Sequence, residues 1–174
     1  MSYLRPLPRD WGSIGLTMTG SYLLEQAVST VVSYDCAGLY GLTCSAGGNQ
    51  GPDFKWRHDL RVTWLTPWNV DLSLNWRYLS PVSLDQNSAQ PALFAGFYDT
   101  YPTDARIPAY NYFDVSAAWK ARKWLSVRVG VDNLTDKDPP IQSGQAIFNG
   151  NGGGDENAYT GTYDSVGRVF FLTL

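Results

Sequence analysis

The amino-acid sequence predicts an all-β fold, an antiparallel up-and-down sheet of about six strands, and three observations lead to that prediction. Apolar and polar residues alternate with a period of two in several separate segments. Gly, Pro, Asn and other turn-forming residues interrupt those segments. The 174 residues contain no run of about 18 apolar residues, which is the length that a membrane-spanning helix needs.

The first strand is expected at 13–24, where Ile14, Leu16 and Met18 alternate with small polar residues. A polar segment of about thirty residues follows, rich in Gly, Ser and Asn. The second strand, 54–66, has the clearest alternation, because aromatic and aliphatic residues there alternate with charged ones.

A tight connection leads from the second strand into the third, expected at 70–78 with the same sidedness. A second long segment, 80–108, carries four prolines and shows no sustained alternation.

The fourth strand, 110–121, is joined by a short turn at Arg122 and Lys123 to the fifth, 125–134. A third long loop, 135–161, precedes the last strand at 163–174. The connections therefore alternate between long and short, as in transmembrane barrels that have short periplasmic turns and long extracellular loops. Most connections in compact soluble domains are only about four to six residues long.

Composition agrees with two kinds of β protein. Charged residues make up 17% of the chain, below the usual quarter, and aromatic residues make up 14%. A β-barrel in lipid fits these values, since each of its strands is only half apolar, and so does an aromatic-rich secreted β-sandwich. The net charge of −3 and the scattered Lys and Arg residues argue against a nucleic-acid partner.

Two rows of aromatic residues favour the membrane. Trp64, Trp119 and Trp124 lie at the short turns, whereas Trp56 and Trp76 lie at the opposite strand ends. Eight residues separate Trp56 from Trp64, which is about 27 Å of strand, or about 21 Å along the barrel axis at a tilt of about 40°. An outer-membrane apolar band is about 25 Å tall, so these residues are expected at its two interfaces.

The two alternating sets of residues along each strand, called here its two parities, are expected to face different solvents. A Lys or Arg on the lipid face at mid-bilayer would cost about 2–4 kcal/mol, so the charged parity is assigned to the barrel interior. The residues expected to face lipid are Leu60, Val62, Leu72, Leu74, Val115, Val127, Val129 and Val131. The residues expected to line the lumen are Arg57, Asp59, Arg61, Asp71, Arg77, Asp114, Lys120, Arg128 and Asp132.

The segment VRVGVDNLTDKDPP, followed by a Gly-rich loop and the terminal TYDSVGRVFFLTL, resembles the C-terminal end of TonB-dependent outer-membrane receptors. In that family a strand ending in a VNNLFDK-like motif precedes a long loop, and the last strand reads approximately YDPxGRxFxVxL. The resemblance is specific over 125–174 and looser back to Trp11. The matching residues are Val129, Val131, Asn133, Leu134, Asp136, Lys137, Tyr163, Asp164, Gly167, Arg168, Phe170, Leu172 and Leu174.

The resemblance implies part of a 22-stranded barrel around a plug. Residues 1–10 are expected to be a lead-in at a truncation point and 11–174 the last barrel strands, with the plug and the export signal on residues outside this sequence. The implied partners are outer-membrane lipid, the remaining strands and plug, the TonB energy-coupling complex through the missing N-terminal part, and the barrel-insertion machinery. The insertion signal would comprise Gly167, Phe170, Leu172 and Leu174, although family members usually end in an aromatic residue.

The implied function is energy-coupled uptake of a large scarce solute, such as a siderophore, cobalamin or an oligosaccharide, in the bacterial outer membrane. No enzyme activity and no cofactor are expected. Alternatives are a small independent barrel acting as a porin or adhesin, a secreted carbohydrate-binding β-sandwich, and a fragment with no function of its own.

Few residues suggest site chemistry. Cys36 and Cys44 lie in a loop expected to face outward, where a disulfide is favoured over two free thiols. His58 is the only histidine, so a Ser-His-Asp apparatus has no basis, and no metal site is expected. By analogy with the family, loop aromatic residues could touch a ligand, although such residues also commonly pack within the loops; they are Tyr40, Phe94, Phe97, Tyr98 and Tyr101.

Overall fold

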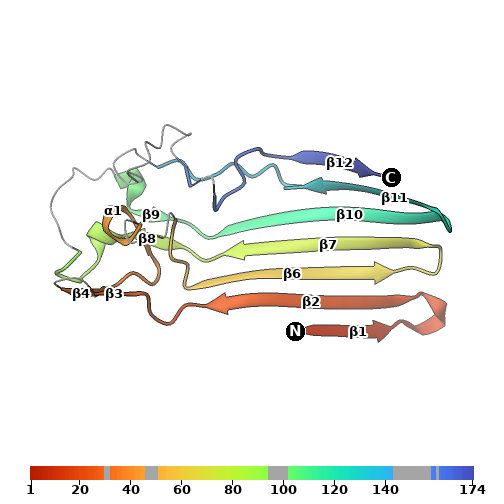
Figure 1. Ribbon diagram of the computed structural model, residues 1–174, viewed down its shortest axis with the longest axis horizontal. Coiled ribbons are helices and arrows are strands. Elements are labelled where there is room, and N and C mark those ends of the chain that lie inside the picture. Colours follow the sequence, from red (N-terminus) through yellow and green to blue (C-terminus); the bar gives the residue numbers. More distant parts are fainter. Residues whose placement is uncertain (30–31, 46–50, 94–101, 143–157, 160) are drawn as a thin grey trace.

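A computed structural model describes residues 1–29, 32–45, 51–93, 102–142, 158–159 and 161–174. It contains one seven-stranded sheet in the order β1-β2-β6-β7-β10-β11-β12, in which every neighbouring pair is antiparallel (Figure 1). The all-β, up-and-down prediction is confirmed, and the sheet is open rather than closed into a barrel. The strands are β1 (Ser2–Pro6), β2 (Ser13–Tyr22), β6 (Trp56–Leu65), β7 (Val70–Leu79), β10 (Tyr110–Arg122), β11 (Leu125–Asp132) and β12 (Val169–Thr173).

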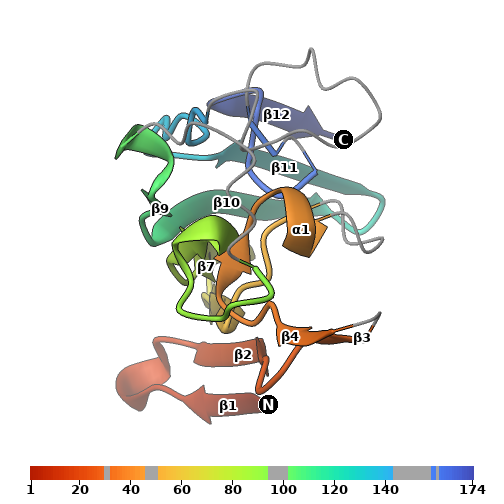
Figure 2. The same ribbon diagram turned by 90° about the vertical axis from the view of Figure 1, so that its left-hand side faces the viewer.

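Short turns and long connections lie at opposite ends of the sheet, called here the turn end and the loop end (Figure 1). The long connections form small elements of their own, and Figure 2 looks onto them from the loop end. These elements are β3 (Ala27–Ser29), β4 (Ser33–Asp35), β5 (Leu39–Tyr40), α1 (Leu42–Ser45), β8 (Val82–Leu84) and β9 (Arg106–Ile107), with 3-10 turns at Asp85–Asn87 and Pro102–Asp104; a further 3-10 turn, Pro8–Asp10, lies in the β1–β2 hairpin at the turn end. We call the small elements of the long connections the loop cap.

No strand was predicted within the first ten residues, and Ser2–Pro6 forms β1, which pairs along β2. Two prolines in YLRPLP hide the alternation, yet Pro6 stands at the strand end, where a missing N–H is tolerated. Gly12 closes the β1–β2 hairpin with φ +84°, and a Cβ there would lie 1.9 Å from the carbonyl oxygen of Leu65. Only glycine therefore fits this turn.

The last strand begins later than its alternation predicts. β12 spans Val169–Thr173, whereas a strand was expected from residue 163. Tyr163 is instead buried at the loop end, and Gly167 adopts φ +72°, which breaks an extended run. The six residues before β12 thus belong to the loop packing rather than to the sheet.

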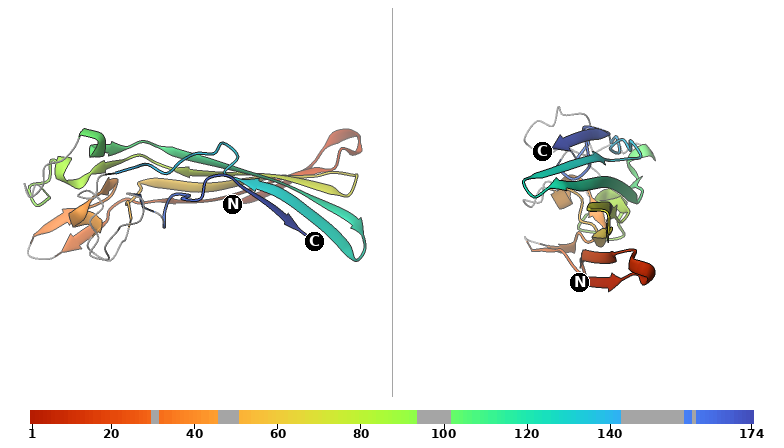
Figure 3. Two further views of the ribbon diagram at one scale, coloured as in Figure 1. Left: turned by 90° about the horizontal axis from the view of Figure 1, so that it is seen from above. Right: turned by 90° about the vertical axis from the view of Figure 1, so that its right-hand side faces the viewer.

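Strand register places the two parities on opposite faces along the whole sheet. Seen from above, the strands form one long twisted layer (Figure 3). A single row of paired residues crosses the apolar face from edge to edge: Tyr3, Leu16, Val62, Leu74, Val115, Val131 and Phe170. The charged residues of β6, β7 and β11, with Asp114 and Lys120 of β10, occupy the opposite face, whereas Arg5 of β1 pairs with Ile14 on the apolar face.

The buried core lies at the loop end rather than against the apolar face. It is an aromatic-rich cluster of Tyr40, Phe54, Val82, Leu84, Ile107, Tyr110, Tyr112, Tyr159 and Tyr163. The apolar face remains exposed, with Leu74 at 40% and Val129 at 46%. A soluble β-sandwich needs a second sheet over that face, and the described residues form none there. None of the described helices has the length and apolar character required to cross a membrane.

Candidate functional site

The charged face carries an ion-pair network centred on Arg77 of β7. Its guanidinium binds the carboxylate of Asp114 on β10 through Nε at 3.0 Å and Nη2 at 3.1 Å. The same group binds Asp164, in the β11–β12 connection, at 3.0 Å and 2.6 Å. Arg77 also lies 5.0 Å from the ring centre of Tyr112. This paired geometry fixes the last long connection to the charged face of the sheet.

Asp114 extends the network to β6 and β11. It accepts the backbone N–H of Asn133 at 2.9 Å, and the Asn75 amide donates to it at 3.3 Å. The Asn75 amide also donates to Asp59 at 3.1 Å. Charged and polar residues from four adjoining segments thus pair with one another on this face, although Oδ1 of Asn75 has no partner among the described residues.

A hollow of about 410 Å³ lies beside the network, at the loop end of the charged face. Its walls are mostly polar or aromatic and come from β2, β6, β7 and β10, with Thr162 of the last connection. Arg57 on its wall is exposed and bonds only the hydroxyl of Ser21 at 3.1 Å among the described residues. Most of the surface inside the hollow is apolar, and the Arg57 guanidinium at its wall favours an acidic group beside that surface.

The two motifs that carry the family resemblance pack directly against each other. Asn133, completely buried, forms a tight turn by bonding the backbone of Lys137 at 3.0 Å and 2.9 Å. Asp136 in that turn accepts the backbone N–H of Arg168 at 2.9 Å and its guanidinium at 3.2 Å. These bonds lower the pKa of Asp136. The DNLTDK and VGR segments therefore form one clamp at the start of β12.

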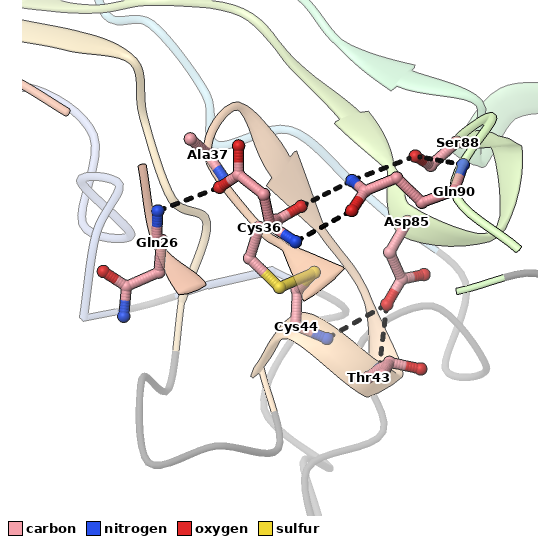
Figure 4. Close-up of a disulfide and its surroundings, with 9 residues drawn as sticks. Gln26, Cys36, Ala37, Thr43, Cys44, Asp85, Ser88 and Gln90 are labelled. Atoms are coloured by element: carbon pink, nitrogen blue, oxygen red, sulfur yellow. Dashed lines mark hydrogen bonds between the residues drawn. A yellow bond between two sulfur atoms is a disulfide. The ribbon is translucent and has the colours of Figure 1, made fainter. Parts of the chain in front are cut away.

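The loop cap is held by a disulfide and by side-chain to backbone bonds (Figure 4). Cys36 and Cys44 are bonded with a Cα–Cα separation of 5.5 Å, and both are buried. The Asp85 carboxylate accepts the N–H groups of Thr43 at 2.8 Å and Cys44 at 3.1 Å. Burial raises the pKa of Asp85, which has no exposed surface.

A second set of bonds joins the first long connection to the second. Gln90 donates to the backbone carbonyl of Asp35 at 2.7 Å and accepts the Asp35 N–H at 2.8 Å (Figure 4). The Asp35 carboxylate in turn accepts the N–H groups of Gln26 and Ala37, both at 2.9 Å. The connections at the loop end therefore form one packed unit rather than separate loops.

Of the five aromatic residues expected to contact a ligand, Tyr40 is fully buried. Its hydroxyl donates to the Asp104 carbonyl and bonds the Gln142 amide, and burial raises its pKa. Tyr40, a candidate ligand contact, thus packs inside the loop cap, where its side chain has no exposed surface. The other four lie outside the described residues: Phe94, Phe97, Tyr98 and Tyr101.

The aromatic residues at the loop end form an interlocked cluster on the apolar face. The Trp56 indole N–H donates to Nδ1 of His58 at 2.9 Å, and that imidazole stacks on Tyr78 at 5.2 Å. Trp76 contacts His58 edge-on at 4.6 Å and donates to Asn111 at 2.8 Å. His58 thus serves as an acceptor within the cluster, a role that its sequence position alone does not reveal.

The charged residues of this face were predicted from the sequence, whereas their partners were not. Arg77 and Asp114 are brought together, and Lys120 pairs with Asp71 at 2.8 Å. Asp164 was not predicted as a partner of Arg77, because it lay within a strand expected to begin at 163. Asp85 was not predicted as a functional residue either, because its bond to the Cys44 N–H spans 41 positions of the chain.

These features define a segment of a β-barrel: antiparallel strands in sequence order, one apolar face, one charged face, and long connections gathered at one end. The chain is similar to the crystal structure of a point mutant of the ferric enterobactin receptor (PfeA) of Pseudomonas aeruginosa in complex with enterobactin. The TM-score is 0.55 at 15% sequence identity, over 98% of this chain and 21% of the receptor chain. The likeness establishes the fold, and the chain spans about one fifth of the receptor's length.

A crystal structure of another point mutant of the same Pseudomonas aeruginosa receptor gives a TM-score of 0.49 at 14% identity, with the same coverage of both chains. No protein-family model matches the chain, and no curated protein matches it.

Proposed function

We propose that this chain is the C-terminal part of an outer-membrane receptor that takes up a large scarce solute by energy coupling through TonB. The solute class is a siderophore, cobalamin or an oligosaccharide. The remaining strands and the plug of the receptor would complete the barrel, and the coupling complex would engage its N-terminal part. The observation that supports this proposal most directly is the edge-to-edge apolar row on an uncovered sheet, opposite a charged face.

The placement of the faces follows from desolvation. Lipid would cover the apolar face, so that its exposed aliphatic side chains bury their surface in hydrocarbon. The face bearing Arg77 and Asp114 would line the interior, where the ion pairs and the plug or water satisfy the charges. In this arrangement the loop cap faces outward and the short turns face the periplasm.

The C-terminal strand fits recognition by the barrel-insertion machinery. Phe170 and Leu172 of β12 alternate on the apolar face and are exposed at 74% and 64%. The clamp of Asp136 on Arg168 sets where β12 begins. Gly167 supplies the left-handed residue that this entry into the strand requires.

The test is the location and size of the species that carries these residues in the source organism, followed by uptake. We expect it in the outer-membrane fraction, several times larger than 19.3 kDa, and migrating faster on electrophoresis before heating than after. Deleting its gene should abolish uptake of one iron-loaded siderophore, or of cobalamin or an oligosaccharide, under limitation of that solute. A 19.3 kDa membrane species would indicate a small independent barrel, and a soluble species would refute the membrane placement.

A further inference from the structure

A basic and aromatic patch at the turn end has no role in the function proposed so far. It consists of Trp68 in the β6–β7 turn and of Trp119, Arg122, Lys123 and Trp124 at the β10–β11 turn. The two turns are neighbours, because the backbone N–H of Lys120 bonds the carbonyl of Asn69 at 2.9 Å. We call this set the turn-end patch.

The indole groups differ in their hydrogen bonding. Trp56 and Trp76 at the loop end, and Trp64 at the turn end, each donate their N–H to an acceptor within the chain. In the part of the chain that the structure describes, the indole N–H groups of the patch have no acceptor, and the side chains are exposed. The exposed fractions are 60% for Trp68, 53% for Trp119 and 80% for Trp124.

The patch also holds unpaired positive charge. Lys120 is neutralised by Asp71, whereas Arg122 and Lys123 are exposed and form no ion pair with any described residue. Five basic and two acidic residues gather at the turn end, and the basic ones are Arg5, Arg9, Lys120, Arg122 and Lys123. The connections 23–55, 80–109 and 133–168 hold eleven acidic and four basic residues. The chain is therefore acidic overall but basic at this one end.

We propose that the turn-end patch binds the headgroup of an anionic phospholipid in the leaflet at the turn end. Arg122 and Lys123 would pair with the phosphate and the net negative charge of the lipid. The free indole N–H groups would donate to glycerol and ester oxygens, the depth at which tryptophan rings settle in a bilayer. The proposal rests on the membrane placement argued above and adds a lipid class that this placement does not require.

The patch favours a lipid over an acidic protein segment because its basic residues lie next to the apolar face of the sheet. Trp119 belongs to the apolar face, paired with Val70 and Val127, and the basic residues follow it directly at the strand end. Hydrocarbon on one side and headgroup phosphate on the other match that sequence of groups. A basic residue near such a surface contributes a preference of roughly fivefold.

The experiment compares lipid classes at the protein boundary. The protein is purified from its native membranes in a neutral detergent and reconstituted into phosphatidylcholine vesicles containing trace spin-labelled phosphatidylglycerol or spin-labelled phosphatidylcholine. We expect at least about fivefold preference for phosphatidylglycerol, weakened in 0.5 M NaCl. Arg122→Gln/Lys123→Gln should lower the ratio to near one. Lys55→Gln/Arg106→Gln, which removes the same charge from exposed sites in the long connections, should leave it unchanged.

The outcomes separate the two proposals. Equal association with both lipids would overturn the headgroup site while leaving the membrane placement intact, since the protein would still hold boundary lipid. An equal loss of preference in both double variants would also overturn it, because the effect would then belong to net charge. Failure to immobilise either lipid would refute the membrane placement, and the headgroup site with it.

Discussion

Replacing Arg77 with methionine is expected to destabilise the protein by leaving two carboxylates without their cation. The guanidinium makes four bonds, two to Asp114 and two to Asp164. The exposed fractions of the three side chains are 32% for Arg77, 17% for Asp114 and 28% for Asp164. They are neither fully solvated nor fully buried, so each pair lies between the limits of exposed and buried ion pairs.

The expected magnitude follows from that intermediate burial. Charged hydrogen bonds in proteins contribute about 1.5–3 kcal/mol and exposed ion pairs about 0.2–1 kcal/mol, so each carboxylate pair should contribute about 1–2 kcal/mol. Arg77→Met should therefore lower the free energy of unfolding by about 3 kcal/mol. Asp164→Asn should lower it by about 1–2 kcal/mol and should add little when Arg77 is already replaced.

A double-mutant cycle measures the coupling. Urea unfolding of the protein in detergent, followed by β-sheet circular dichroism, is compared for the wild type, Arg77→Met, Asp164→Asn and the double variant. Arg61→Met is the matched control. Arg61 is on β6, on the same face of the sheet as Arg77, and it forms no ion pair with the described residues. The control should change stability by less than about 0.5 kcal/mol. A coupling energy below about 0.3 kcal/mol between Arg77 and Asp164 would refute the reasoning.

Three further predictions concern the loop cap and the last strand. Replacing Cys36 and Cys44 with serine opens a nine-residue ring and should lower the free energy of unfolding by about 2–3 kcal/mol on the chain-entropy model. The loss should appear as faster protease cleavage of the loop cap, and unchanged cleavage would contradict the prediction. Gly130→Ala would place a Cβ 2.4 Å from Cζ of Phe171, so about 1–3 kcal/mol should be lost in urea unfolding and partly restored by adding Phe171→Ala. Because burial raises the pKa of Asp85, its contribution to stability is complete below the unfolded pKa of about 3.9 and is lost as pH rises through the higher folded value. Asp85→Asn should therefore stabilise the cap at pH 7.5 more than at pH 4.5, measured by urea unfolding at both.

The strands and their sidedness could be predicted from sequence because both follow from a local period of two. Each interior strand has a clear alternation, and its expected bounds differ from the observed ones by a few residues at most. β1 escaped prediction because two prolines interrupt its short pattern. The start of β12 was misplaced because Tyr163 keeps the parity of Val169 and yet packs into the loop core, a tertiary preference that no local pattern encodes.

The loop cap could not be predicted, because its stability depends on contacts between distant segments. Asp35 bonds Gln90 across 55 positions, and Arg77 bonds Asp164 across 87. Neither pair leaves a periodic signal, and short polar residues in Gly-rich segments resemble solvated loop. Tyr40 illustrates the consequence: ligand contact and loop packing were both open for an aromatic residue in such a segment, and it is fully buried in the core cluster.

The joining of the long connections into one cap has a consequence for motion. Separate loops can each close over a solute independently, and each then loses conformational entropy on doing so. Here the described parts of the loop cap are joined to one another by the disulfide, by the Asp35–Gln90 bonds and by the shared aromatic core. A displacement of one of these connections must therefore break those bonds or carry the bonded connections with it.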